Sequence, residues 1–202
     1  MVIRILLADD QALVRGALAA LLGLEPDIEV AAQVSRGDEV IDAAREADVD
    51  VCLLDVEMPG ADGIEATAAL RTALPHIRSI IVTTFGRPGY VRRALEAGAG
   101  GFVVKDTPSG ELAEAVRRVH AGERVIDPAL ATESLLDGAN PLTDRERDVL
   151  LASVDGAPVA QVAAAVHLSA GTVRNYASAA IAKTGAATRV EAARIARDRG
   201  WL

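Results

Sequence analysis

The sequence predicts an α/β domain with an open, doubly wound parallel sheet, followed by a smaller domain built only of helices. Short apolar runs alternate with helical patterns over residues 1–121, which is the order of elements in such a sheet. Residues 141–202 carry helical patterns alone. Half of the 202 residues are hydrophobic and only 2% are aromatic, so we expect cores built from Ala, Val, Leu and Ile.

Five apolar runs of strand length predict the strands of the sheet. They cover residues 2–8, 28–34, 51–54, 79–84 and 101–105. Apolar residues at helical spacing predict the helices between them. These cover residues 13–23, 39–47, 64–74, 89–97 and 109–121. Right-handed crossovers would place these helices on both faces of a five-stranded sheet whose core ends near residue 121.

Carboxylates follow two of the predicted strands, at the edge where a parallel sheet opens its functional crevice. Asp9 and Asp10 end the first strand, and Asp55 ends the third, before the turn residues 58–60. A lone aspartate in such a place more often only ends a strand or caps a helix. Three acids at one edge repel one another unless a cation lies among them, and Mg²⁺ prefers hard oxygen ligands of this kind.

Two further polar residues are expected at the same edge of the sheet. Thr83 ends the fourth predicted strand and Lys105 ends the fifth. Metal-binding acids, a hydroxyl and an ammonium together are what phosphoryl transfer to an aspartate requires. Mg²⁺ and Lys105 would neutralise charge on the phosphoryl oxygens while Asp55 attacks in line.

The remainder of the chain divides into a linker and a helical domain. Residues 122–140 have mixed polarity and are predicted to form the linker, with a short helix at about 128–136. Four helices follow, and Thr143 with Glu146 has the pattern of a capping box at the first. A tight turn at 167–169 joins the second helix to a basic third one, which is typical of a helix-turn-helix. The alternative is a small bundle whose charges are merely solvated.

Acidic and basic residues are divided unevenly between the two parts of the chain. Residues 1–140 hold 13 Lys and Arg against 23 Asp and Glu, whereas residues 141–202 hold 8 against 6. The whole-chain charge of −8 would argue against a nucleic-acid partner, but the C-terminal part carries a positive balance. We therefore expect an acidic control half and a basic binding half.

Cysteine usage and hydropathy predict where the protein resides. The single cysteine, Cys52, lies inside a predicted strand and has no partner for an intramolecular disulfide. No basic-then-apolar leader opens the sequence, and no apolar run approaches the roughly 18 residues of a membrane span. These features predict a cytoplasmic protein without a membrane partner.

The segments ILLADD, DVCLLDVEMPGADG, IIVTTF and GFVVKD resemble the receiver domain of two-component response regulators of the NarL/FixJ class. The resemblance covers residues 1–121 and implies a flavodoxin-like fold for them. It also implies that a sensor histidine kinase phosphorylates Asp55. Mg²⁺ would then be held by Asp9, Asp10, Asp55 and the backbone carbonyl of Glu57.

The same resemblance assigns three residues to the surroundings of the phosphoryl group. Thr83 matches the switch hydroxyl, and Lys105 matches the lysine that pairs with the phosphoryl group. Phe102 stands where receivers have a switching aromatic residue, most often Tyr. Because Phe lacks the hydroxyl, any hydrogen bond that Tyr makes in its inward rotamer is absent.

The segments PLTDRERDVL, LSAGTVRNYASAAIAK and RVEAARIARDRGWL resemble the LuxR-type helix-turn-helix domain over residues 141–202. In that family the helix that begins near Ser169 enters the major groove. The resemblance implies that it contacts DNA through five residues. Thr172 and Lys183 would bind phosphates, and Arg174, Asn175 and Ser178 would face base edges.

Together the two resemblances imply a transcriptional regulator, and not an enzyme that turns over a metabolite. Phosphorylation would promote a homodimer that binds promoter DNA, with RNA polymerase as a further candidate partner. The dimer surface stays open between two faces. One face carries Leu13, Val14, Leu112, Val116 and Val119, and the other carries Arg92 and Arg93.

Three alternative functions share some of these sequence features. An aspartate-nucleophile phosphatase also uses Mg²⁺, but it places its acids after the first strand and needs a cap domain. A flavin-binding protein would need a hydroxyl-rich phosphate loop, where Asp9 and Asp10 would instead repel phosphate. A DNA-binding protein that works without phosphorylation is the third alternative.

Overall fold

The computed structural model describes residues 2–84, 88–127, 130 and 140–202. The chain divides into two compact units, an α/β unit and a helical unit, and each is described by itself. The predicted short helix at about 128–136 lies almost entirely outside the described residues. None of the described helices is long and apolar enough to cross a membrane.

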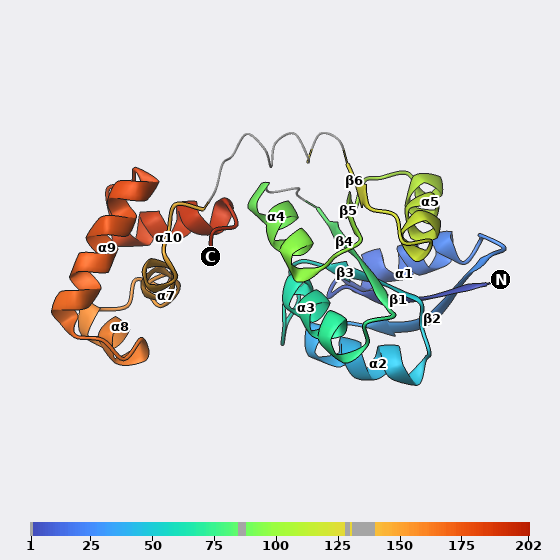
Figure 1. Cartoon of the computed structure of the whole chain (residues 1–202), viewed down its shortest axis with the longest axis horizontal. Coiled ribbons are helices and arrows are strands. Elements are labelled where there is room, and N and C mark those ends of the chain that lie inside the picture. The colour runs from blue at the N-terminus through green and yellow to red at the C-terminus, as the bar shows by residue number, and fades with distance from the viewer. Residues whose placement is uncertain (1, 85–87, 128–129, 131–139) are drawn as a thin grey trace. The chain divides into compact units, whose positions relative to one another are not determined.

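The α/β unit is built around a parallel sheet in the order β2-β1-β3-β4-β5-β6 (Figure 1). The strands are β1 (Ile3–Ala8), β2 (Ile28–Val34), β3 (Val51–Asp55), β4 (Arg78–Thr83), β5 (Gly101–Val104) and β6 (Val125–Ile126). All strand pairs of this sheet are parallel. The chain thus starts near one edge and reverses its direction of winding between β1 and β3, so the predicted doubly wound fold is confirmed.

The described sheet has six strands, one more than the five that the sequence predicts. The additional strand, β6, comes from the segment predicted as linker, and its residues pair with Gly101 and Phe102 of β5. Two residues are too few to show an alternating or continuous apolar pattern, so periodicity alone does not reveal such a strand. The strand arises from the neighbouring edge of β5, whose backbone groups are available for pairing.

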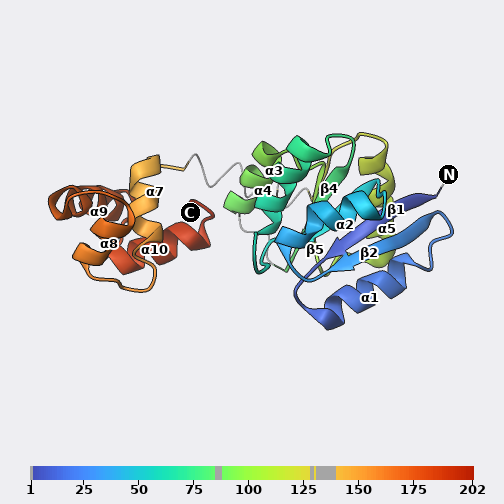
Figure 2. The ribbon, with the colours of Figure 1, turned by 90° about the horizontal axis from the view of Figure 1, so that it is seen from below.

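Helices cover both faces of the sheet (Figures 1 and 2). They are α1 (Ala12–Leu22), α2 (Val40–Glu46), α3 (Gly63–Ala73), α4 (Pro88–Ala97) and α5 (Ser109–His120), with a 3₁₀ turn, η1 (Gly37–Glu39), before α2. Helices α1 and α5 lie together on one face, where Leu22 and Val116 join a core with Ile5, Leu53 and Ile80. Strand residues of the opposite parity are also buried, because the other helices cover the second face.

The helical unit contains α7 (Asp144–Leu151), α8 (Val159–Ala165), α9 (Ala170–Thr184) and α10 (Arg189–Asp198). The predicted capping box at the start of α7 is present, since Thr143 and Glu146 bond reciprocally through side chain and backbone. Val162 of α8 and Val173 of α9 pack with Val149 of α7 in one core cluster. The turn between α8 and α9 and their shared core form the predicted helix-turn-helix.

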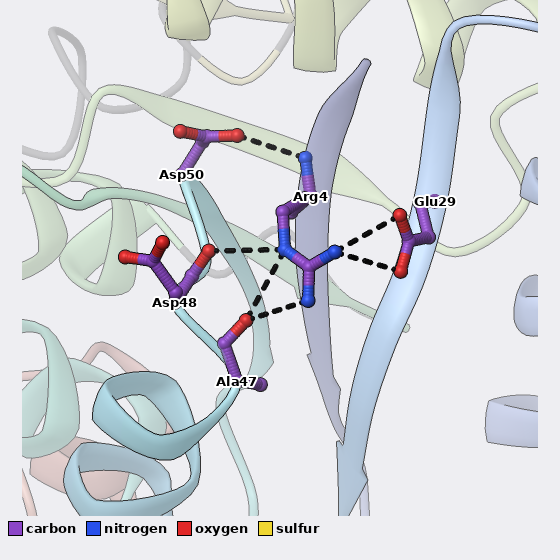
Figure 3. Close-up of polar contacts among 5 residues, drawn as sticks. All are labelled: Arg4, Glu29, Ala47, Asp48 and Asp50. Atoms are coloured by element: carbon purple, nitrogen blue, oxygen red, sulfur yellow. Dashed lines mark hydrogen bonds and ion pairs between the residues drawn. The ribbon is translucent and has the colours of Figure 1, made fainter.

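A polar network ties β1 to the end of α2 (Figure 3). The Arg4 guanidinium donates from Nη2 to the carbonyl of Ala47 at 2.9 Å and from Nε to the carbonyl of Asp48 at 3.2 Å. It also donates from Nη1 to both carboxylate oxygens of Glu29, at 2.9 and 3.0 Å. Since the last carbonyls of a helix lack intrahelical donors, Arg4 caps α2 from a neighbouring strand.

Arg4→Met is expected to lower the free energy of unfolding of the α/β unit by about 1–2 kcal/mol, because it removes the donors to these carbonyls. Arg45→Met is the matched control, since the Arg45 side chain forms an exposed pair with Asp42, worth about 0.3–0.5 kcal/mol. Urea denaturation measures the change in unfolding free energy of each variant, and hydrogen exchange measures the protection of β1 and α2. Equal losses in the two variants would contradict the capping role of Arg4.

Candidate functional site

Asp9 is the most completely restrained of the predicted site residues. It directly follows β1, is buried, and its N–H donates to the carbonyl of Val34 at 3.2 Å. Its Oδ1 accepts the N–H of Gln11 at 2.9 Å, and its backbone carbonyl accepts from the Arg15 guanidinium at 2.5 Å. The carboxylate of Asp9 is therefore held in one orientation by its own loop.

Lys105 brings the acids of two strands together. Its ammonium lies 2.8 Å from Oδ2 of Asp9 and 3.0 Å from Oδ2 of Asp55, and the lysine side chain is only 7% exposed. The backbone N–H of Lys105 donates to the carbonyl of Thr83 at 2.7 Å, which fixes the lysine beside the end of β4. Because β1, β3, β4 and β5 are consecutive neighbours in the sheet, residues at the ends of four strands converge at this edge.

Three of the four predicted metal ligands, the carboxylates of Asp9, Asp10 and Asp55, form one cluster. One carboxylate oxygen from each of Asp9, Asp10 and Asp55 lies within 4.8 Å of the others. Asp9 and Asp55 are buried, whereas Asp10 is exposed and opens the cluster to solvent. An all-carboxylate donor set with a solvent side is suitable for a hard cation that keeps some of its water. The residues present therefore match the chemistry of Mg²⁺.

Burial changes the protonation of the pocket. Burial raises the pKa of Asp55 above its usual value, and the nearby Asp9 carboxylate adds to this, while Lys105 partly offsets it. Burial by itself would lower the pKa of Lys105, but the Asp9 and Asp55 carboxylates together raise it. The pocket thus holds a fixed positive charge beside a carboxylate that cations help to keep ionised.

Two of the three remaining residues of the predicted pocket, Thr83 and Phe102, are also buried. Thr83 is the last residue of β4 and pairs in register with Val104, so it lies at the same edge as Lys105. Phe102 of β5 is fully buried, with its ring packed inward. Glu57, whose backbone carbonyl was predicted as a ligand, has an exposed side chain.

Sequence reasoning missed Arg15 as part of this pocket. Arg15 lies on α1 and binds the backbone of Asp9, so it supports the loop that carries two of the acids. The six-residue spacing between Asp9 and Arg15 did not predict this contact, because a hydrogen bond to a backbone carbonyl does not require a particular residue type as the acceptor. A basic residue in the first turns of a helix that follows an acidic strand end is the only cue.

The predicted DNA-contacting residues lie along α9. Arg174, Asn175 and Ser178 are exposed, while the neighbouring Val173 and Ala177 are buried. The polar side chains therefore share one solvent-facing stripe of the helix. Thr172 is half-buried, and its hydroxyl is hydrogen-bonded to that of Ser169 at 2.8 Å.

Lys183 differs from the other residues predicted to contact DNA. Its ammonium donates to Oε2 of Glu146 at 2.7 Å, and the Glu146 side chain is only 5% exposed. The same oxygen accepts the N–H of Thr143 at 2.7 Å. The capping-box glutamate of α7 thus binds the end of α9, a contact that the sequence analysis did not foresee.

The helical unit is expected to lose stability in acid because of Glu146. Burial alone would raise the pKa of Glu146, but Lys183 and Thr143 outweigh it and hold the pKa below its usual value. The contribution is therefore complete above the ordinary glutamate pKa of about 4.3 and is lost as pH falls through the lower, folded-state pKa. Urea denaturation followed by Trp201 fluorescence at a series of pH values measures this. Glu146→Gln should flatten the pH dependence, and an unchanged slope would contradict the assignment.

The two units together define a class of protein. A doubly wound sheet with an acidic pocket at its edge, joined to a helix-turn-helix, is the organisation of a response regulator that binds DNA. Two family models match accordingly. Residues 5–117 match the response regulator receiver domain, and residues 140–196 match the bacterial regulatory proteins of the luxR family.

Individual relatives match over almost the whole chain. The transcriptional regulatory protein DesR of Bacillus subtilis is 42% identical over 200 residues, which is 99% of each chain. The response regulator RamR of Streptomyces coelicolor is 42% identical over 202 residues, which is 98% of each chain. The crystal structure of response regulator ChrA, from a heme-sensing two-component system, is 31% identical with a TM-score of 0.61 and covers 100% of this chain and 99% of that one. The chain therefore belongs to the LuxR family of two-component response regulators, which are transcriptional regulators and not metabolic enzymes.

Proposed function

We propose that Asp55 accepts a phosphoryl group from a sensor histidine kinase and that this controls the binding of promoter DNA by α9. The observation that carries the proposal is the convergence of Asp9, Asp55 and Lys105 within ion-pairing distance, with Asp10 beside them. We propose a receiver domain at residues 1–121, a linker at 122–140 whose strand β6 adds to the receiver sheet, and a DNA-binding domain at 141–202.

The pocket supports a direct transfer. A carboxylate oxygen of Asp55 forms a bond to phosphorus while the bond from phosphorus to the donor's imidazole nitrogen breaks, and the imidazole leaves with the electron pair. Lys105 and the hydroxyl of Thr83 would then bind the phosphoryl oxygens. Mg²⁺, held by Asp9, Asp10, Asp55 and the backbone carbonyl of Glu57, would neutralise charge on those oxygens.

The signal is proposed to reach DNA through a change in the receiver surface. A phosphoryl group adds roughly −1.5 to −2 charges at Asp55, which attracts the Thr83 hydroxyl and the Lys105 ammonium. Buried Phe102 on β5 would move with this edge of the sheet. On DNA, Thr172 would bind phosphate, and Arg174, Asn175 and Ser178 would read base edges. The protein would act in the cytoplasm, with RNA polymerase as a further partner.

Exposed side chains favour α1 as the surface on which a second copy docks. Leu13 is 86% exposed, and Leu24, just after α1, is 79% exposed. The same candidate face includes three apolar residues of α5. These residues are buried in the core and are not available for a partner: Leu112, Val116 and Val119. A second copy is the occupant that a two-fold DNA site requires of a single small helix-turn-helix.

Leu13→Glu is expected to weaken the phosphorylated dimer by about tenfold or more, because burying one leucine is worth roughly 1.5–3 kcal/mol. Leu151→Glu is the matched control, since Leu151 is also exposed but lies on the helical unit. Sedimentation velocity of both variants after phosphorylation measures the dimer. Equal dissociation constants for Leu13→Glu and the wild type would exclude this surface.

Acetyl phosphate separates the proposed function from its alternatives. Incubation with acetyl phosphate and Mg²⁺ should add one phosphoryl group to the protein, detected as an intact-mass gain, and a chelator should prevent it. Multiple turnovers of an organic phosphate without a stable mass gain would instead identify a phosphatase. DNA binding that is unchanged after complete labelling would identify a regulator that works without phosphorylation.

A further inference from the structure

Each of the two lysines of the chain pairs with a buried carboxylate, and the two lie in different units. The Lys105 side chain is 7% exposed and that of Lys183 is 36% exposed. Only Lys105 and Lys183 are lysines among the 21 basic residues, and the other 19 are arginines. The ammonium of Lys105 lies 2.8 Å from buried Asp9, and that of Lys183 lies 2.7 Å from buried Glu146. A compact ammonium can pair with a buried carboxylate that has room for a single donor, whereas the planar guanidinium of arginine binds phosphate through two donors at once.

Glu146 depends on Lys183 for its charge balance. The Glu146 side chain is 5% exposed and closes the capping box of α7, so it has little access to water. Removing the Lys183 ammonium would leave the buried Glu146 carboxylate without this ion-pair partner, which is a strongly destabilising change. The pair joins the first turn of α7 to the last turn of α9.

The position of this pair matters for DNA recognition. Residues Leu150 of α7 and Ala180 of α9 lie in one core cluster, so the pair and the core together hold α9 against α7. Arg174, Asn175 and Ser178 lie on α9, so the orientation of their side chains depends on the packing of α9 against α7.

We propose that Lys183 is a positioning residue, which neutralises Glu146 and so fixes the recognition helix, and that it is not a phosphate contact. The proposal rests on the proposed role of α9 in DNA binding. Lys183 belongs to the five residues that the family resemblance assigned to DNA contact, and its ammonium already pairs with Glu146. Since the pair is neutral as a whole, removing both partners leaves the local charge unchanged.

Folding measurements on the full-length protein test the first half of the proposal. Trp201, the only tryptophan, is buried in the core of the helical unit, so its fluorescence follows the unfolding of that unit. Lys183→Met should lower the folding equilibrium constant on the order of tenfold to a hundredfold. The same substitution in a Glu146→Gln background should have a much smaller effect, because no buried charge is then left unpaired. Equal effects in both backgrounds would overturn the proposal.

The salt dependence of DNA binding tests the second half. The probe is a duplex selected by the wild-type protein from a random-sequence pool. The Glu146→Gln, Lys183→Met double variant should show the wild-type slope of log affinity against log salt, whereas loss of a phosphate contact would lower the slope by about 1. Arg174→Met, which removes a predicted base-edge contact of α9, is the comparison variant, and it should relax specificity at one position of the duplex. A lower slope in the double variant would overturn the proposal.

Failure of this proposal can be distinguished from failure of the proposed function. A wild-type protein that selects no duplex contradicts the proposed DNA binding, whereas the folding measurement still decides whether Lys183 acts through Glu146. Lys183→Arg serves as the conservative variant, and it should recover part of the lost stability because a guanidinium retains the charge.

Discussion

Asp55→Asn is expected to abolish the mass gain that acetyl phosphate and Mg²⁺ produce in the wild-type protein. Asn preserves the shape of the side chain but has no carboxylate oxygen that can attack phosphorus. Intact-mass spectrometry after identical incubations measures the result. Labelling of the variant to the wild-type extent would show that the phosphoryl group resides on another residue.

Glu57→Gln is the matched control for this substitution. Glu57 lies two residues after Asp55, and its side chain is exposed, so only its backbone carbonyl is assigned to the pocket. Labelling should therefore persist in Glu57→Gln. If both variants lost labelling, a general loss of acidic charge near the pocket would explain the result better than removal of the nucleophile.

Lys105→Met is expected to slow phosphorylation on the order of 100-fold or more, because it removes a preorganised positive charge from the phosphoryl oxygens. It should also make the stability of the receiver depend more strongly on Mg²⁺. Without the ammonium, the buried carboxylates of Asp9 and Asp55 face each other uncompensated, and a bound cation then stabilises the folded state by a larger amount.

The rate of labelling and the thermal midpoint, each with and without Mg²⁺, measure the effects of Lys105→Met. Arg118→Met is the control, because Arg118 forms an exposed pair with Glu123 on the surface of the same unit. It should label at the wild-type rate with a wild-type response to Mg²⁺. A Lys105→Met protein that behaved like this control would contradict the assigned role of the lysine.

The pocket was predictable because strand ends are visible in a sequence. Asp9, Asp55 and Lys105 each follow a short apolar run, and parallel strands bring such residues to one edge of the sheet. Apolar runs and helical spacing likewise predicted five of the six described strands of the sheet and the helices between them. The strand β6 was not predicted because two residues are too few to show a pattern. It forms by pairing with the neighbouring edge of β5.

Contacts between distant elements could not be predicted in the same way. Arg15 binds a backbone carbonyl, and Arg4 caps a helix from a strand, so neither contact requires a particular partner residue type. The pairing of Lys183 with Glu146 spans 37 residues and depends on how α7 crosses α9. Sequence likeness alone assigned Lys183 to DNA because it records which residues recur and not what each one contacts.

The most direct test of the central claim compares the DNA affinity of one preparation before and after phosphorylation of Asp55. The labelled residue is located by peptide mass after reduction of the acyl phosphate with borohydride, and affinity for the selected duplex is measured on the same sample. We expect the affinity to rise with the fraction of protein phosphorylated at Asp55, and we expect no rise in Asp55→Asn. Constant affinity across fully labelled and unlabelled protein would contradict this claim.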